Sequence, residues 1–114
     1  MISSGVVVYV SCEPVDFRKG AASLMALVRD GGLDPFNGAL YVFRSKRADR
    51  IKIVWWDGSG VCLYSKTLEN CGFCWPGLSA ARIRLDHSQL MALLAGMDWK
   101  KIRPNKIKRP VLTG

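Results

Sequence analysis

Residues 40–66, LYVFRSKRADRIKIVWWDGSGVCLYSK, determine the fold class. They contain three runs rich in β-branched and aromatic residues, 40–44, 50–56 and 61–66, separated by links of five and four residues. Links this short join antiparallel neighbours. The glycines of the second link, Asp57-Gly58-Ser59-Gly60, tolerate the positive φ angles of a tight hairpin. The stretch therefore predicts an antiparallel β-meander.

Alternation within these runs assigns their side chains to the two faces of the sheet. In the middle run, one face carries Ile51, Ile53 and Trp55, and the other carries Arg50, Lys52, Val54 and Trp56. In the first run, Leu40 and Val42 alternate with Tyr41 and Phe43. We expect Trp55 in the core, while Trp56 suits either the core or an exposed contact surface.

The segment before the meander predicts a strand, a helix and a turn. Val6–Val10 is a β-branched and aromatic run that favours a strand. Apolar residues then recur with helical spacing over Phe17–Arg29, with Asp16 at the position of an N-cap and Gly31-Gly32 at the end of the helix. Residues 34–38, Asp-Pro-Phe-Asn-Gly, predict a turn.

The segment after the meander adds smaller elements. Residues 73–75 are a possible edge strand stopped by Pro76, and Ile83 and Leu85 suggest a short last strand. A second helix follows, in which Asp86 and Gln89 form a capping box. Its apolar stripe consists of Leu90, Leu93, Leu94 and Met97, and Gly96 closes it. We therefore predict a single α+β domain over residues 1–99, an antiparallel sheet with two helices packed on one face, followed by a basic, flexible tail over residues 100–114.

Size and composition limit the class of protein. A chain of 114 residues has room for one core, and 49% hydrophobic residues suffice to build it. The N-terminus lacks the pattern of a secretory signal, and no apolar run is long enough to cross a membrane. We therefore expect a cytoplasmic protein whose four cysteines, Cys12, Cys62, Cys71 and Cys74, are reduced.

Two kinds of chemical site are conceivable but poorly supported by the sequence. Cys71-Gly72-Phe73-Cys74 offers two zinc ligands, with Cys62 and either Cys12 or His87 as remote partners, but there is no second such pair. Four acids are candidates for a metal-dependent nuclease: Asp49, Asp57, Glu69 and Asp98. Each of them also fits a turn or an element end. We therefore expect no catalytic residues, no metal and no cofactor.

The distribution of charge is the stronger functional signal. The chain carries 17 Lys and Arg against nine Asp and Glu, and six of the cations follow Trp99 with no acid among them. A second cluster surrounds the link between the first two strands of the meander. A near-neutral body with two basic segments suits a polyanion such as DNA. The candidate DNA-binding residues are Arg18, Lys19, Arg44, Lys46, Arg47, Arg50, Lys52, Lys100, Lys101, Arg103, Lys106, Lys108 and Arg109.

Several motifs together resemble a known family. They include Asp16-Phe17-Arg18-Lys19-Gly20, residues 34–38, Leu40-Tyr41-Val42-Phe43-Arg44, the run 51–60 with its Trp-Trp-Asp-Gly, Trp75-Pro76 and Asp98-Trp99. In this order and spacing, over roughly residues 5–99, the chain is similar to the small TnpB accessory proteins of the insertion-sequence family numbered sixty-six. The resemblance implies a protein encoded beside a separate, larger transposase and needed for efficient transposition. It supplies no catalytic residues.

Charge and resemblance together predict a bacterial accessory protein that supports DNA transposition by binding DNA at the ends of the element. The basic hairpin and the tail are then expected to hold the DNA. The alternative is an interaction module that docks on the transposase without binding DNA, with Trp56 or the exposed side of the sheet as its anchor.

Overall fold

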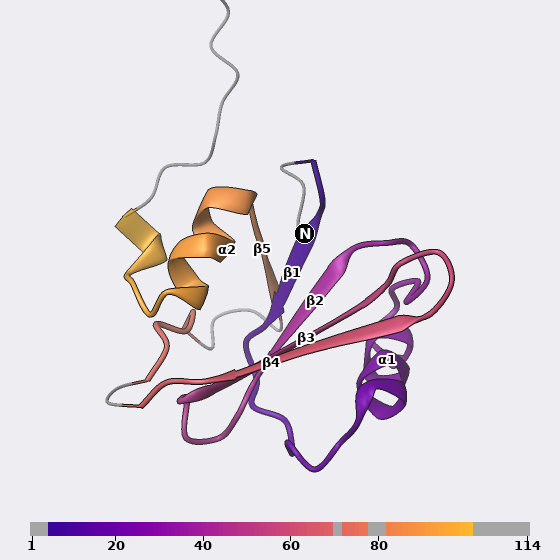
Figure 1. The fold of residues 1–114 in the computed structure, drawn as a ribbon, viewed down its shortest axis with the longest axis horizontal. Coiled ribbons are helices and arrows are strands. Elements are labelled where there is room, and N and C mark those ends of the chain that lie inside the picture. The colour runs from indigo at the N-terminus through magenta and orange to yellow at the C-terminus, as the bar shows by residue number, and fades with distance from the viewer. Residues whose placement is uncertain (1–4, 70–71, 78–81, 102–114) are drawn as a thin grey trace, which may run out of the picture.

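The computed structural model describes residues 5–69, 72–77 and 82–101, which fold into one sheet with two helices (Figure 1). The strands are β1 (Val8–Ser11), β2 (Leu40–Arg44), β3 (Arg50–Trp56), β4 (Val61–Thr67) and β5 (Arg82–Leu85). The helices are α1 (Ala21–Asp30), α2 (His87–Leu94) and the short 3-10 helix η1 (Trp99–Lys101). The strand order is β4-β3-β2-β1-β5, and all neighbours are antiparallel except β1 and β2. The predicted α+β class is confirmed.

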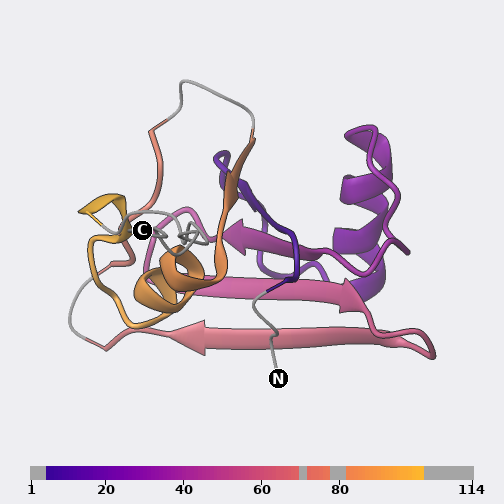
Figure 2. The same cartoon turned by 90° about the horizontal axis from the view of Figure 1, so that it is seen from above.

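The predicted meander is present as β2, β3 and β4, which run side by side (Figure 2). The bounds of β2 and β3 are those expected, and β4 ends one residue later, at Thr67. In the β3–β4 turn, the backbone N–H of Asp57 donates to the carbonyl of Gly60 over 3.0 Å. Gly58 adopts a φ of 101°, which glycine reaches without a Cβ clash. Turn chemistry therefore closes this hairpin where the sequence indicated.

The first strand joins the sheet differently from the rest. The expected strand Val6–Val10 is displaced to Val8–Ser11, and β1 lies parallel to β2, with Tyr9 opposite Tyr41. Parallel neighbours need a long crossover, and α1 lies in the segment that provides it. Because β5 pairs with the other edge of β1, the meander grows into a five-stranded sheet.

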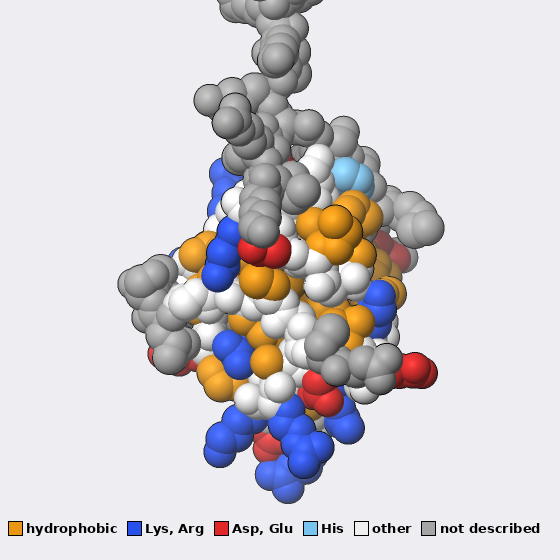
Figure 3. Space-filling view, turned by 90° about the vertical axis from the view of Figure 1, so that its left-hand side faces the viewer, with side chains coloured by type: hydrophobic (Ala, Val, Ile, Leu, Met, Phe, Trp, Pro, Cys, Tyr) orange, Lys and Arg blue, Asp and Glu red, His pale blue; other side chains and the backbone are white. Residues whose placement is uncertain are grey.

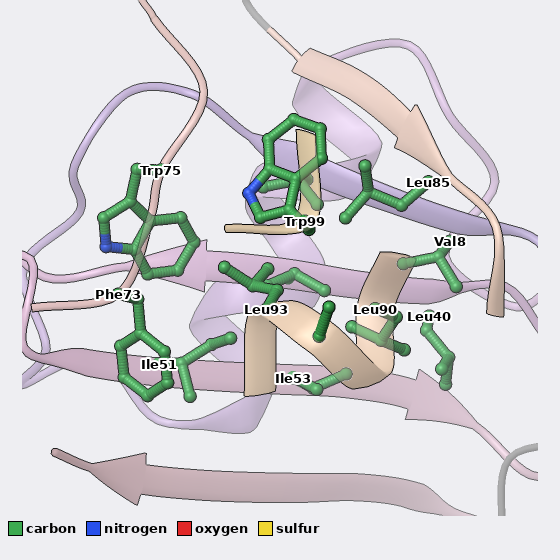
Figure 4. Packing of buried hydrophobic residues seen from close by; sticks show 13 residues of the cluster. Val8, Leu40, Ile51, Ile53, Phe73, Trp75, Leu85, Leu90, Leu93 and Trp99 are labelled. Atoms are coloured by element: carbon green, nitrogen blue, oxygen red, sulfur yellow. The ribbon is translucent and has the colours of Figure 1, made fainter. Parts of the chain in front are cut away.

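The two helices cover opposite faces of the sheet, and this corrects the expectation that both pack on one face. On one side, Leu24, Met25 and Val28 of α1 pack with Tyr41, Phe43 and Val54; we call this cluster the α1-side core. On the other side, Leu90 and Leu93 of α2 pack over Ile51 and Ile53, together with Trp99; we call this the α2-side core (Figure 4). The physical reason is that β2 is apolar on both faces, so each face requires a cover.

The paired tryptophans of β3 point to these two cores. Trp55 is half-buried and packs against the α2-side core, and Trp56 is half-buried and packs against the α1-side core. Each indole therefore contributes to a core while part of it still contacts solvent.

Helix α1 begins later than expected. It starts at Ala21, its N-cap is Gly20 and no side chain caps it, so the assignment of Asp16 as N-cap and of Phe17 as the first residue is wrong. The cause is a competing use of Asp16, whose carboxylate accepts a hydrogen bond from the backbone N–H of Arg18 in a separate turn. The predicted end is confirmed, since Gly31 is the C-cap and Gly32 has a φ of 87°.

Helix α2 matches its prediction at the start. Asp86 and Gln89 form the capping box, and Leu90 and Leu93 are fully buried. The helix ends at Leu94, and Gly96 takes a φ of 76°, so Met97 lies beyond the apolar stripe and is 56% exposed.

The expected edge strand at residues 73–75 is wrong. This segment is irregular, and Phe73 and Trp75 are instead buried in the α2-side core. The edge strand next to β1 is β5, which contains Ile83 and Leu85 and corresponds to the predicted short last strand.

The folded body extends to the beginning of the predicted tail. Trp99 is buried, and its indole N–H donates to the carbonyl of Cys74. The division into a domain over residues 1–99 and a tail over residues 100–114 stays a prediction, because residues 102–114 lie outside the described part. Within the described residues, no helix is long and apolar enough to cross a membrane.

Candidate nucleic-acid interface

A hollow of about 690 Å³ lies where the loop before α1 meets the turn between β2 and β3. Residues 14–18 line one side, and residues 45–47, 49 and 50 line the other. Four of the predicted DNA-binding cations, Arg18, Lys46, Arg47 and Arg50, are among them. Figure 3 shows Lys and Arg side chains gathered at this lower end of the molecule. We call this hollow the basic pocket.

A buried serine organises the turn that carries three of these cations. Ser45 is 7% exposed, and its hydroxyl accepts a hydrogen bond from the backbone N–H of Arg50 over 3.2 Å. The same hydroxyl donates to the Asp49 carboxylate over 3.4 Å. Lys46 and Arg47 are exposed, so the turn presents their charges to solvent. A rigid frame of this kind reduces the entropy lost when such side chains bind a ligand.

The turn is also attached to the α2-side core. Ala48 has a φ of 65°. This left-handed conformation costs a residue with a Cβ about 1 kcal/mol. In that conformation its carbonyl accepts hydrogen bonds from the backbone N–H of Phe73 over 2.8 Å and from the indole N–H of Trp75 over 3.0 Å. The segment wrongly expected to be a strand therefore holds the basic turn in place.

The loop on the other side of the pocket is fixed by backbone and side-chain bonds. The backbone N–H of Val15 donates to the carbonyl of Arg44 over 3.0 Å. The ammonium of Lys52 donates to the carbonyls of Phe17 (2.7 Å) and Lys19 (3.2 Å) and lies 5.0 Å from the ring centroid of Phe17. These contacts bring the loop against β3, and so bring Arg18 to the same hollow as the turn.

Arg18 is held by Asp16. The Asp16 carboxylate accepts hydrogen bonds from the backbone N–H of Arg18 over 2.9 Å, from Nε over 3.0 and 3.1 Å, and from Nη2 over 2.8 Å. The Arg18 side chain is nevertheless 92% exposed. The hydrogen bonds from the Arg18 side chain, followed by the one from its backbone, lower the pKa of Asp16 to about 2. The Asp16 carboxyl group is therefore ionised at neutral pH.

The sequence-predicted cations divide into two groups in the structure. Those of the basic pocket, Arg18, Lys46, Arg47 and Arg50, are brought together. Arg44 lies elsewhere, half-buried with its guanidinium 5.6 Å from the ring centroid of Trp75, and Lys52 is occupied by the two carbonyls described above. Lys19 is exposed but does not line the pocket. The role of Asp16 was missed, although its position two residues before Arg18 is a signal for such a turn.

Most of the predicted tail residues lie outside the described part of the chain. Lys100 is exposed and its ammonium lies 6.0 Å from the ring centroid of Trp99. Lys101 ends η1. Arg103, Lys106, Lys108 and Arg109 lie outside the described residues, so their DNA contacts remain predictions.

The cysteines and acids considered as metal ligands do not assemble in the described part of the chain. Across residues 5–69, 72–77 and 82–101, no group of three or more His, Cys, Asp or Glu side chains is placed to hold a metal ion. Cys12 is buried, which raises the pKa of its thiol. The thiols of Cys62 and Cys74 face single carboxylates, those of Asp57 and Asp98. Cys71 lies outside the described residues.

A second surface of interest surrounds Trp56. This tryptophan is half-buried, and the ring of Phe36 meets it edge-on with centroids 5.2 Å apart. Val61 and Leu63 pair with Trp56 and Val54, so they point to the same face of the sheet, where they are 40% and 43% exposed. We call Phe36, Trp56, Val61 and Leu63 the apolar patch.

Comparison with known proteins identifies a family and two relatives. The family model of IS66 Orf2-like proteins (TnpB of IS66) matches residues 6–104. The uncharacterized protein y4jC of Sinorhizobium fredii is 39% identical over 109 residues, which cover 95% of this chain and 93% of that protein. The uncharacterized protein y4hO of the same organism is 36% identical over the whole of both chains. No solved structure matches significantly. The chain belongs to the IS66 Orf2-like family, the TnpB-type accessory proteins of these insertion sequences.

Proposed function

We propose that this accessory protein supports transposition by binding DNA through the basic pocket, with the tail adding affinity. The observation that carries the proposal is the convergence of four cations from two segments of the chain on one hollow. Two acids, Asp16 and Asp49, line the same hollow, so cations remain in excess there. Guanidinium forks and an ammonium in a concave site match the oxygens of a phosphate backbone.

Such a site gives affinity with little sequence information. Each neutralised phosphate releases counterions, so four contacts predict a slope of log affinity against log salt of about −3.6. Raising the salt from about 50 to about 200 mM would then weaken binding roughly 150-fold. Contacts made by the tail would make the slope steeper still.

The test compares two variants of equal net charge. Arg47→Ala with Arg50→Ala removes two pocket cations, while Arg29→Ala with Arg84→Ala removes two exposed cations that do not line the pocket. Fluorescence anisotropy on labelled duplex DNA from an element end, and on a scrambled duplex, measures affinity at several salt concentrations. We expect the first variant to lose about two units of salt slope and the second to lose much less. Equal losses would show that only net charge matters, and the pocket would have no role.

The alternative function, docking on the element's transposase, is favoured by the apolar patch. Phe36 is 59% exposed and, with Val61 and Leu63, gives an apolar contact area at the β4 edge of the sheet. A pull-down with the transposase after nuclease treatment tests it, with Leu63→Ser as the variant and Met97→Ser, at an exposed methionine outside the patch, as the control. Loss of capture with Leu63→Ser alone supports docking, and capture that disappears with nuclease supports DNA bridging.

A further inference from the structure

We propose that Asp16 is a positioning residue for nucleic-acid binding: it holds the guanidinium of Arg18 in a fixed orientation at the basic pocket, with the outer edge of the fork free for a phosphate. The proposal rests on the proposed function of the pocket. In this proposal, the acidic side chain of Asp16 strengthens the binding of an anionic phosphate. Charge repulsion alone would instead make Asp16 weaken that binding.

The geometry of the pair leaves one part of the fork for a ligand. The bonds to Asp16 use Nε and Nη2, and Nη1 makes no hydrogen bond within the described residues. A guanidinium has five N–H donors, so a phosphate can still be bound through the outer edge. The exposed fraction of the Arg18 side chain, 92%, means that packing does not hold it. The bonds to Asp16 are therefore what limits its motion.

Two effects of opposite sign compete when Asp16 is replaced. Loss of the carboxylate removes one repulsive charge from the pocket, which strengthens phosphate binding about twofold at moderate salt. It also frees a long side chain, and ordering such a side chain again on binding weakens affinity roughly tenfold. The second effect is the larger, so we expect Asp16→Asn to weaken binding about fivefold, although it makes the protein more positive.

One substitution can keep the turn at Asp16 while it weakens the contact between the Asp16 carboxylate and the Arg18 guanidinium. Asparagine preserves an oxygen that accepts from the backbone N–H of residue 18, so Asp16→Asn retains the turn and loses mainly the charged fork contacts. Asp57→Asn is a matched control. Asp57 is exposed, accepts hydrogen bonds from the backbone N–H groups of Ser59 and Gly60, and has a pKa also lowered to about 2 by those bonds. It follows the opposite end of β3 and does not line the pocket.

A double-mutant cycle separates positioning from folding. In the wild-type background we expect Asp16→Asn to weaken binding of a labelled duplex of about 25 base pairs about fivefold, and Asp57→Asn to leave it within about twofold. In an Arg18→Ala background there is no fork to position, so Asp16→Asn should instead strengthen binding about twofold. A purely structural role for Asp16 would weaken binding in both backgrounds. Arg18→Lys keeps the charge but not the planar fork, so in that background Asp16→Asn should no longer weaken binding.

The outcomes distinguish this proposal from the one on which it rests. If wild-type protein binds with a steep salt slope and Asp16→Asn binds as tightly or more tightly, positioning is refuted while DNA binding stands. Equal weakening by Asp16→Asn in both backgrounds also refutes it. If the wild-type protein does not bind DNA, or if Arg47 and Arg50 contribute no more than Arg29 and Arg84, both proposals are overturned.

Discussion

A substitution of Lys52 distinguishes most clearly between a role of this residue in folding and a role in DNA binding. Its ammonium donates to the carbonyls of Phe17 and Lys19, at 2.7 and 3.2 Å. Lys52 is only half-buried. Hydrogen bonds from a charged group contribute about 1.5–3 kcal/mol, and partial exposure reduces this, so the pair together should contribute about 2 kcal/mol. Lys52→Met keeps the alkyl stem and removes both bonds. It should lower the melting temperature by roughly 10 °C, given the usual scaling for a domain of about 100 residues.

The matched control is Lys46→Met, which removes the same charge from an exposed position on the basic turn. This variant should change stability by less than about 0.5 kcal/mol. It should also lower the salt slope of DNA binding by about 0.9, whereas Lys52→Met, measured below its melting transition, should leave that slope unchanged. Thermal unfolding by circular dichroism and anisotropy titrations at several salt concentrations measure the two quantities. If Lys52→Met melts like the wild type and reduces the slope by about one, Lys52 contacts phosphate, and the inference that it holds the loop against β3 is wrong.

Three other perturbations test the fold. Leu93 is fully buried in the α2-side core. Leu93→Ala should therefore destabilise the protein by about 2–5 kcal/mol in urea unfolding. The Asp86 side chain accepts from the Gln89 backbone N–H at 2.8 Å. Its removal in Asp86→Ala should cost about 1 kcal/mol in the same assay. Asp57 has a folded pKa lowered from 3.8 to about 2, so its ionised form stabilises the fold above about pH 4. Wild-type melting temperature should therefore exceed that of Asp57→Asn at neutral pH, with the gap closing between about pH 4 and about pH 2; a gap that widens in acid would contradict this assignment.

Local chemistry explains which parts of the fold could be predicted from the sequence. The bounds of β2 and β3 follow from alternation and from the turn residues between the strands, and the start of α2 follows from its capping box. These signals act within a few residues. The start of α1 failed for the same kind of reason, because Asp16 had two local options and the turn with Arg18 prevailed.

Long-range pairing explains what could not be predicted. The alternating side chains of β2 are large and mostly apolar on both faces, so this strand indicates that each face needs a cover, but not which element supplies it. Nor does any local pattern reveal that β1 lies parallel to β2. Residues 73–75 had the composition of a strand, but their apolar side chains were required in the α2-side core instead.

The candidate site shows the same limit, since its cations come from two segments joined by contacts that no sequence pattern records. Arg44 was predicted together with Arg47 and Arg50, but it lies on the face of β2 that carries Leu40 and Val42, where its guanidinium meets Trp75. The grouping of Arg18 with the basic turn depends instead on a backbone bond between Val15 and Arg44.

Some of these cations contact the protein itself and others face the basic pocket, and the position of each side chain on the fold explains the difference. The stems of Lys52 and Arg44 start inside strands and lie along apolar surface, so their charged ends meet carbonyls or an aromatic ring of the protein itself. Lys46 and Arg47 start on the turn, and Arg50 is the first residue of β3; these three side chains are exposed and make no hydrogen bond or ion pair with the described part of the chain, so they can reach a ligand. The position of the basic turn depends on hydrogen bonds to the Ala48 carbonyl. Their donors, Phe73 and Trp75, belong to the α2-side core. Formation of that core and formation of the basic pocket are therefore coupled, because the same hydrogen bonds serve both.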